Sequence, residues 1–563
     1  GSYYPVSEVA DNLGETQSSG VELQLSSVNI RTKDFQWSTD LNLSSYKDRW
    51  RKRNPYTILS VYNTTTDPLH VKWGYVSDGI IQIGENVPHM SDAAPGSIKI
   101  KDLRLNILES NLTKGPILKS LIKLAIPIMA SSFLATLYNI TDMAWIGLLG
   151  SKAVAGVGVG GMFTWLSQGL SSIARMGGQV QVAQCIGRGD KESAHKYAQT
   201  AMQLSLYMGL LFAVFSLVFV HQMVGFFNLT DVEAYDAAIS YTRIACGLIV
   251  FSFMTMTLTG VYTAQGDSKT PFLANLVGLV TNMILDPLLI LGPGPLPKLG
   301  VSGAAIATVT AQFIVMSIMV LDIIWQKKEN VLKGIHLIGR MSGKYLSGIC
   351  KIGIPTGIQG MVYCMISMLI TRMVSAFGAE AVATLRVGGQ IESVSWNTAD
   401  GFATALNAFT AQNYGAGKID RVKKGYRASL WTIGIWGLLI TLIFIFTPTP
   451  IATIFFHEPS AIATAVSYLV IIGFSEAFLC IELTTIGAIS GLGKTNLCSI
   501  ISILFTSARI PLAMILGNTS MGLNGIWWAF SSTTIIKGII FTGTFFWIIK
   551  KCPKNMNTPS SQA

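Results

Sequence analysis

Two regions of the chain differ in how apolar and polar residues follow one another. In residues 1–110 the two classes alternate at every second position, most clearly over 21–25 and 35–43. This period of two predicts β-strands. From residue 115 to about 552 the alternation gives way to long apolar runs, which predict helices buried in a bilayer.

Twelve of these runs are long enough to cross about 30 Å of hydrocarbon at about 1.5 Å per residue. They lie near 118–148, 153–184, 194–221, 236–264, 270–292, 302–326, 345–376, 381–412, 426–447, 461–488, 495–517 and 523–549. The sequence therefore predicts an all-α polytopic membrane protein with twelve transmembrane helices. A β-rich or poorly ordered fragment, residues 1–110, precedes them.

Composition supports a membrane protein and argues against a soluble enzyme. Only 13% of the residues are charged, against about 25% in soluble domains, and the mean hydropathy is +0.48. The net charge of +11 does not indicate a nucleic-acid partner, because residues 1–110 carry 11 basic and 13 acidic side chains. The basic excess therefore lies in short loops between the apolar runs.

These loops alternate in charge along the chain. One set carries 21 Lys and Arg residues, whereas the other set carries only Lys152 and Lys298. By the positive-inside rule, both ends of the helical region and the loop 327–344 are cytoplasmic. We expect a multi-pass protein of a bacterial inner membrane.

The helical region also repeats itself at an offset of 228 residues, and small gaps shift later matches. Matching positions include Pro127 and Pro355, Gly150 and Gly378, Gln184 and Gln412, and Gly187 and Gly415. Six helices per repeat give both halves the same orientation, with a pseudo-two-fold axis along the membrane normal and a cavity between them. The predicted parts are an N-lobe (115–326), a linker (327–344), a C-lobe (345–552) and a cytoplasmic tail (553–563). Such an architecture is that of a transporter.

Asp142 is one of the few ionisable residues inside a predicted span. An ionisable group costs several kcal/mol in the bilayer, so it is a functional candidate. Tyr138 and Asn139 precede it by one helical turn and share its face.

A second polar stripe follows the fifth span. Asn275, Asn282 and Asp286 lie on one helical face of an otherwise apolar run. Pro287 has no N–H to donate to the carbonyl of Met283, so we expect a kink there. A carboxylate, an amide and a free carbonyl are suited to binding a proton or Na⁺, or to facing a cationic substrate.

Further charged residues lie in the C-lobe spans. Opposite charges there are interpreted as packing pairs, with cavity-lining roles as the alternative. The acidic ones are secondary site candidates: Glu392, Asp400, Glu476 and Glu482, with Arg386, Arg509 and Lys537 as basic neighbours.

Several motifs resemble those of the multidrug and toxic compound extrusion (MATE) transporters. They are the loop 186–190 (IGRGD), its partner 412–418 (QNYGAGK), and the runs 264–271, 282–287 and 303–308. The resemblance covers about 435 residues. It implies the MATE fold of two pseudo-symmetric six-helix bundles.

The resemblance also implies roles for particular residues. In the DinF-like branch, an Asp in helix one and an Asn-x-x-x-Asp in helix five form the coupling site of the amino lobe. These roles fall on Asp142, Asn282 and Asp286, with Thr308 as a weaker candidate. The NorM-like branch has an acid in helix seven, and span 345–376 contains none, which favours the DinF-like branch.

The resemblance implies a secondary antiporter that exports cationic or amphiphilic small molecules in exchange for H⁺ or Na⁺, with any Na⁺ held at Asp142, Asn282 and Asp286. We expect a monomer in the bilayer that is not an enzyme, needs no cofactor and binds no nucleic acid. One alternative is a lipid-linked precursor flippase, whose related fold has fourteen spans. The other is a membrane-embedded enzyme, although no catalytic constellation is found.

Residues 15–105 resemble late barrel strands of SusC-like TonB-dependent outer-membrane receptors. A few such strands cannot close into a barrel, and an open edge is not viable in lipid. We interpret this part as a stray fragment from a fusion or a mis-joined gene, with a genuine accessory domain as the alternative.

Three smaller features have structural interpretations. The glycine run 156–161 is expected to permit close helix packing. The seven cysteines have no CxxC pair and are interpreted as buried thiols. Residues 491–495 (GLGKT) resemble part of a P-loop but lack its first glycine and a surrounding βαβ unit.

Overall fold

The computed structural model describes residues 15–31, 36–52, 77–80, 98–100, 112–227, 231–292, 297–325, 330–456 and 458–551. The chain divides into two compact units, Gly1–Asn106 and Ile107–Ala563.

The first unit contains two antiparallel strand pairs. β1 (Glu15–Arg31) pairs with β2 (Gln36–Lys52), and β3 (Ser77–Ile80) pairs with β4 (Ile98–Ile100). Leu23 lies opposite Leu43 in the first pair. The period-two pattern over 21–25 and 36–43 therefore forms strands as predicted, whereas Phe35 lies outside the described residues.

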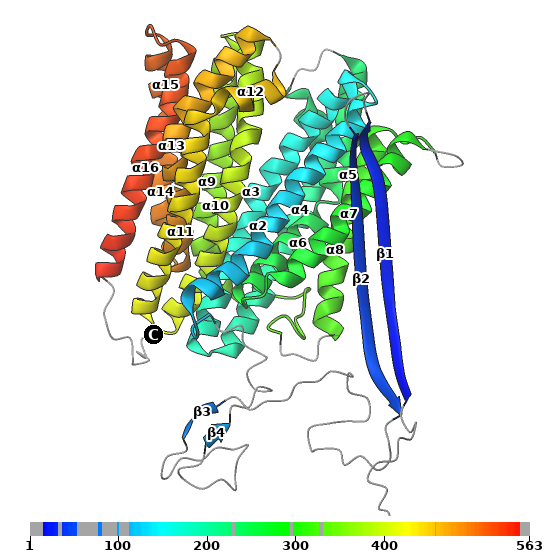
Figure 1. Ribbon diagram of the computed structural model, residues 1–563, viewed down its shortest axis with the longest axis vertical. Coiled ribbons are helices and arrows are strands. Elements are labelled where there is room, and N and C mark those ends of the chain that lie inside the picture. Colours follow the sequence, from blue (N-terminus) through cyan, green and yellow to red (C-terminus); the bar gives the residue numbers. More distant parts are fainter. Residues whose placement is uncertain are drawn as a thin grey trace, which may run out of the picture. The chain divides into compact units, whose positions relative to one another are not determined.

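The second unit is helical (Figure 1). Its elements are α2 (Ile117–Gly147), α3 (Ser151–Arg188), α4 (Lys191–Gly225), α5 (Val232–Gly247), α6 (Val250–Ala264), α7 (Lys269–Leu291), α8 (Val301–Trp325), α9 (Gly343–Ser375), α10 (Ala379–Gly415), α11 (Ile419–Phe446), α12 (Pro448–Phe455), α13 (Pro459–Gly491), α14 (Thr495–Ser507), α15 (Arg509–Gly517) and α16 (Leu523–Lys551). Each of the twelve predicted spans corresponds to one helix or to a pair of consecutive helices.

Two spans are divided, which the apolar pattern did not predict. The fourth consists of α5 and α6, whose axes bend by 47°. The eleventh consists of α14 and α15, which meet at Ala508. Pro511 explains this second break, because a proline clashes with the carbonyl four residues earlier, here that of Ser507, and cannot donate to it.

Ten of the twelve spans are long and apolar enough to cross a membrane, counting the bent pair α5–α6 as one, among the residues that the structure describes. The other two are α3 and α10, which are longer but more polar. They are equivalent helices of the two halves and pack against each other, and α3 also packs on α9. Their polar character fits a position between the halves rather than against lipid.

The duplication is visible in the backbone. Gly150 begins α3 with φ of 105°, and Gly378 begins α10 with φ of 102°. This left-handed region favours glycine. In Figure 1, the helices up to α8 and those from α9 onward form two neighbouring groups, which we call the N-lobe and the C-lobe.

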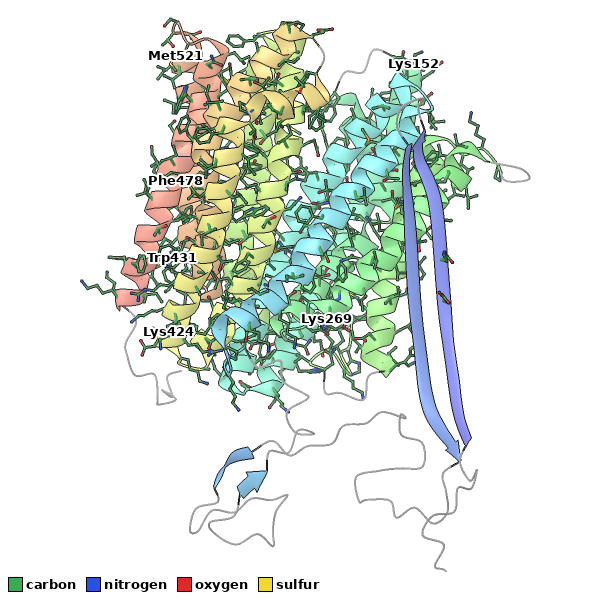
Figure 2. All side chains as sticks on the ribbon, viewed as in Figure 1. Lys152, Lys269, Lys424, Trp431, Phe478 and Met521 are labelled. Atoms are coloured by element: carbon green, nitrogen blue, oxygen red, sulfur yellow. The ribbon has the colours of Figure 1, made fainter. Side chains whose placement is uncertain are left out.

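The two sets of loops lie at opposite ends of the helical unit. Figure 2 shows Lys269 and Lys424 at one end, and Lys152 and Met521 at the other. We call the end with Lys269 and Lys424 the basic end. For these residues, the charge alternation of the sequence matches their placement in space.

The helical unit is held together by apolar packing with buried thiols in it. Five of the six cysteines in the described part are buried, and all six are free. This agrees with their interpretation as apolar core residues.

Candidate functional site

The N-lobe carboxylates Asp142 and Asp286 lie in the interior of the protein. Asp142, in α2, is 7% exposed, and Asn282 and Asp286, in α7, are fully buried. α2 packs against α7. Asn282 Nδ2 donates a hydrogen bond of 3.2 Å to Asp286 Oδ1. All three residues lie toward the ends of their helices, away from the basic end.

Three oxygens in this group have no hydrogen-bond partner: Asp142 Oδ1, Asn282 Oδ1 and Asp286 Oδ2. Asp142 is also near enough to Asp286 for the two charges to repel each other. Buried polar atoms normally have partners. A proton or a small cation would supply one here and would relieve the repulsion.

Tyr241 of α5 belongs to the same neighbourhood, although the sequence did not single it out. It is 7% exposed and interacts electrostatically with both Asp142 and Asp286. Close packing of α3 on α5 holds it there: a Cβ on Gly156 would lie 2.7 Å from Ala237 Cβ, and one on Gly160 would lie 2.5 Å from the Tyr241 ring. The predicted packing role of the glycine run 156–161 is therefore confirmed for Gly156 and Gly160, whereas a Cβ on Gly158 or Gly161 would meet no atom within 4 Å.

The remaining N-lobe candidates do not all join this group. Asn275 and Thr308 line a separate cavity of about 240 Å³, together with Gln312. Tyr138 and Asn139 belong to α2, but their side chains lie outside the described residues. α7 runs through Pro287 to Leu291 as one helix.

The C-lobe contains a larger cavity of about 620 Å³. Three of the four secondary candidates line it: Glu392, Glu476 and Glu482. Asp400 does not; it interacts electrostatically with Arg175 of α3, across the boundary between the lobes.

Part of this charge is paired, as the packing interpretation predicted. Lys537 Nζ lies 2.7 Å from Glu482 Oε1, and both side chains are almost fully buried. The Tyr468 hydroxyl donates a hydrogen bond to Glu392.

The lobes meet at the basic end through two equivalent amide contacts. Gln184 Nε2 donates to the carbonyl of Gly491 at 3.0 Å, and Gln412 Nε2 donates to that of Ala264 at 2.7 Å. These contacts join α3 to the end of α13, and α10 to the end of α6. Each lobe therefore holds the other in the same way.

Two glycines allow this approach. A Cβ on Gly187 would overlap the carbonyl oxygen of Gln412, and one on Gly415 would overlap that of Gln184. The family-like loops 186–190 and 412–418 thus face each other across the lobes. Residues 491–495, which resembled part of a P-loop, form the turn between α13 and α14, with Gly493 at φ of 79°.

A segment before α2 adds to the closure of this end. Arg421 donates to three of its backbone carbonyls, those of residues 112, 114 and 115, at 2.8 to 3.2 Å. Lys418 Nζ donates to the carbonyl of Thr113 at 3.0 Å. The segment that leads into the first helix of the N-lobe is therefore bound to the C-lobe.

Two duplicated helical bundles, joined at one end and holding buried ionisable groups in each half, define a membrane transporter. Comparison with known proteins gives the family. Residues 127–288 and 355–515 each match the MatE family, one match in each lobe. The chain therefore belongs to the MATE family, whose members are transporters and not enzymes.

The matches with individual relatives cover nearly the whole length of those relatives. The chain is 30% identical over 455 residues to the probable multidrug resistance protein NorM of Thermotoga maritima, covering 78% of this chain and 94% of that protein. It is 24% identical over 436 residues to the FAD transporter of Shewanella oneidensis, covering 76% and 94%.

Solved structures share the fold. A MATE family transporter of the MOP superfamily in an outward-facing conformation matches with a TM-score of 0.71 and 23% identity, covering 78% of this chain and 97% of that one. A MOP superfamily transporter from Pyrococcus furiosus matches with the same TM-score and identity. The family match lies wholly within the helical unit. The described part of the chain contains twelve helices or helix pairs of spanning length, rather than the fourteen of the flippase alternative.

Proposed function

We propose that the chain is a secondary antiporter that exports cationic or amphiphilic small molecules in exchange for H⁺ or Na⁺. The coupling ion binds at Asp142, Asn282 and Asp286. The observation that supports this most is the set of three buried oxygens without partners on α2 and α7.

The two candidate ions would use the same atoms differently. A proton on either carboxylate removes the repulsion between Asp142 and Asp286 and gives one of them a donor. A Na⁺ ion would take the three unpartnered oxygens as ligands, because hard cations prefer oxygen. Either ion lowers the negative charge of the site, and so weakens its attraction for a cationic cargo.

Coupling in the N-lobe follows the DinF-like pattern. Helix α9 contains no acidic residue, whereas the NorM-like pattern requires one in that helix. The contacts at the basic end hold this end closed. If the basic end faces the cytoplasm of a bacterial inner membrane, as the positive-inside rule indicates, the conformation is closed toward the cytoplasm.

Transport in vesicles tests this proposal. We expect Asp286→Asn and Asp142→Asn to lower ion-driven export of a cationic dye at least about tenfold, equivalent to about 1.4 kcal/mol of lost stabilisation. Asp236→Asn, which changes an exposed carboxylate of α5, is the matched control and should transport normally. Undiminished export by Asp286→Asn, at equal protein insertion, would refute the assignment.

A further inference from the structure

A groove of about 550 Å³ lies on the C-lobe between α11, α13 and α16. One wall is the stretch of α11 from Arg427 to Leu438, the other wall includes Thr542 and Phe546 of α16, and α13 contributes Ile481. Arg427 and Leu438 are about 17 Å apart along the helix, at about 1.5 Å per residue. This length is close to half of the about 30 Å of hydrocarbon in a bilayer, so the groove extends through one leaflet.

The groove is hollow because α11 has no side chain at its centre. A Cβ on Gly434 would meet no atom within 4 Å. Trp431 and Ile435, which also line the groove, are 75% and 63% exposed. The helices themselves are in contact nearby, since the centre of the Tyr426 ring of α11 lies 3.7 Å from that of the Phe545 ring of α16. The groove is therefore a hollow between helices that pack against each other.

Two basic side chains at the outer end of this groove have no acid. Lys424 and Arg427 are exposed and lie one turn apart on α11. Asp420, in the preceding turn, lies 3.7 Å from Lys423 instead. In the described part of the chain, no carboxylate lies within 4.0 Å of Lys424 or Arg427. Figure 2 shows Lys424 at the basic end and Trp431 farther along the same helix, so the cations lie where the headgroups of one leaflet begin.

The equivalent helix of the N-lobe lacks this arrangement. α4 begins 228 residues before α11, so Lys196 stands at the position of Lys424. Lys196 forms an ion pair with Glu192. Gln199 and Leu206 stand where α11 has its arginine and its glycine. Neither the unpaired cations nor the hollow is therefore a general consequence of the duplicated fold.

The corresponding face of α4 is also covered by the linker. Gln203 Nε2 and the Tyr207 hydroxyl donate to backbone carbonyls of the linker at 2.8 and 3.1 Å. Their counterparts in α11 are Trp431 and Ile435, which are apolar and exposed. Residues 552–563, which follow the C-lobe as the linker follows the N-lobe, contain no Asp or Glu. Their charge does not complement the two cations, whereas an anionic ligand with an apolar part does.

We propose that this groove binds one anionic phospholipid from the leaflet at the basic end. Its phosphate lies on Lys424 and Arg427, and an acyl chain lies along Trp431, Gly434 and Leu438. Basic pockets between transmembrane helices bind anionic headgroups, and tryptophan favours the level of the headgroups. The two cations would repel a cationic cargo, and a free phosphate would leave the apolar part of the groove empty. The proposal does not depend on the export function.

Two lipids with the same acyl chains test the site. Palmitoyl-oleoyl phosphatidylglycerol carries a net negative charge, whereas palmitoyl-oleoyl phosphatidylcholine is zwitterionic. Native mass spectrometry of the purified full chain in detergent measures the affinity of the first bound molecule of each lipid. We expect the wild-type chain to bind phosphatidylglycerol at least about tenfold more tightly. Equal affinity for the two lipids would overturn the proposal.

Removing either cation should reduce this preference. We expect Arg427→Gln and Lys424→Gln each to lower the affinity for phosphatidylglycerol about fivefold and to leave that for phosphatidylcholine unchanged. Lys269→Gln is the matched control, because it removes the same charge at the basic end but apart from Trp431 (Figure 2). All three side chains are exposed, so the variants should fold. An equal loss in Lys269→Gln would show that affinity follows net charge alone, and would overturn the site.

Gly434→Leu distinguishes a bound lipid from a free anion. The new side chain enters the hollow without meeting another atom at its Cβ, and leucine favours a helix more than glycine does. We expect about tenfold weaker binding of phosphatidylglycerol, because the leucine displaces part of an acyl chain. Gly543→Leu, exposed on α16 and also without an atom within 4 Å, lies outside the groove lining and should bind normally. Unchanged binding in Gly434→Leu, or displacement of the lipid by an equal concentration of inorganic phosphate, would overturn the proposal.

Discussion

Gln179 of α3 donates a hydrogen bond of 3.0 Å to Asn407 of α10, and the two residues are 228 positions apart, which is the offset of the internal repeat. Equivalent residues can bond to each other only where the pseudo-two-fold axis passes between them. The axis therefore runs between α3 and α10. The reciprocal contacts of Gln184 and Gln412 flank it toward the basic end.

The glycines at this junction should be intolerant of any side chain. We expect Gly187→Ala and Gly415→Ala to disturb the closed basic end, because each new methyl overlaps a backbone carbonyl of the other lobe. Overpacking of this kind costs about 1–3 kcal/mol. Thermal unfolding in detergent and dye export should both fall. Gly158→Ala is the control, because it lies in the same helix as Gly187 and its new methyl meets nothing within 4 Å. Equal behaviour of all three variants would contradict the packing argument.

The buried pair Lys537 and Glu482 should show strong coupling in a double-mutant cycle. Lys537→Met alone leaves a buried carboxylate unpaired, which should destabilise the protein by about 3–5 kcal/mol. The double variant with Glu482→Gln should recover much of this loss. Additive effects in the melting temperatures would show that the two side chains do not interact.

Tyr241 should link helix packing to ion binding. In Gly160→Ala the new methyl would displace the Tyr241 ring, which is near enough to Asp142 and Asp286 to interact with their charges. We therefore expect the concentration of coupling ion needed for half-maximal export to change at least about threefold, or about 0.6 kcal/mol. Gly161→Ala, which meets no atom within 4 Å, should leave it unchanged. An unaltered ion dependence in Gly160→Ala would remove Tyr241 from the site.

Much of the fold follows from the sequence, because the length of an apolar run and the scarcity of charge inside it are properties of the chain alone. These properties located the spans, and the offset of 228 residues located the two halves. The breaks in the fourth and eleventh spans were not predicted. Pro511 was a usable signal for the second, since its clash with Ser507 follows from sequence position.

The site was predictable only in part, for a physical reason. Asp142, Asn282 and Asp286 are polar residues in apolar helices. Burying each of them costs free energy, so the sequence alone marks them as candidates. Tyr241 is amphipathic and ordinary in such a helix, and only the packing of the helices brings it near enough to interact with the charges of the carboxylates. Similarly, the sequence could not show which C-lobe charges pair, because this depends on which helices face each other.

The central claim is that one small ion is held by Asp142 and Asp286 and leaves when cargo binds. The direct test adds a cationic dye to purified protein in liposomes and measures released H⁺ with a pH indicator and released Na⁺ with a radioactive tracer. The account predicts about one ion released per protein from the wild type, and none from the double variant Asp142→Asn and Asp286→Asn. The same release from the double variant would contradict it, as would the absence of any release from the wild type that still transports the dye.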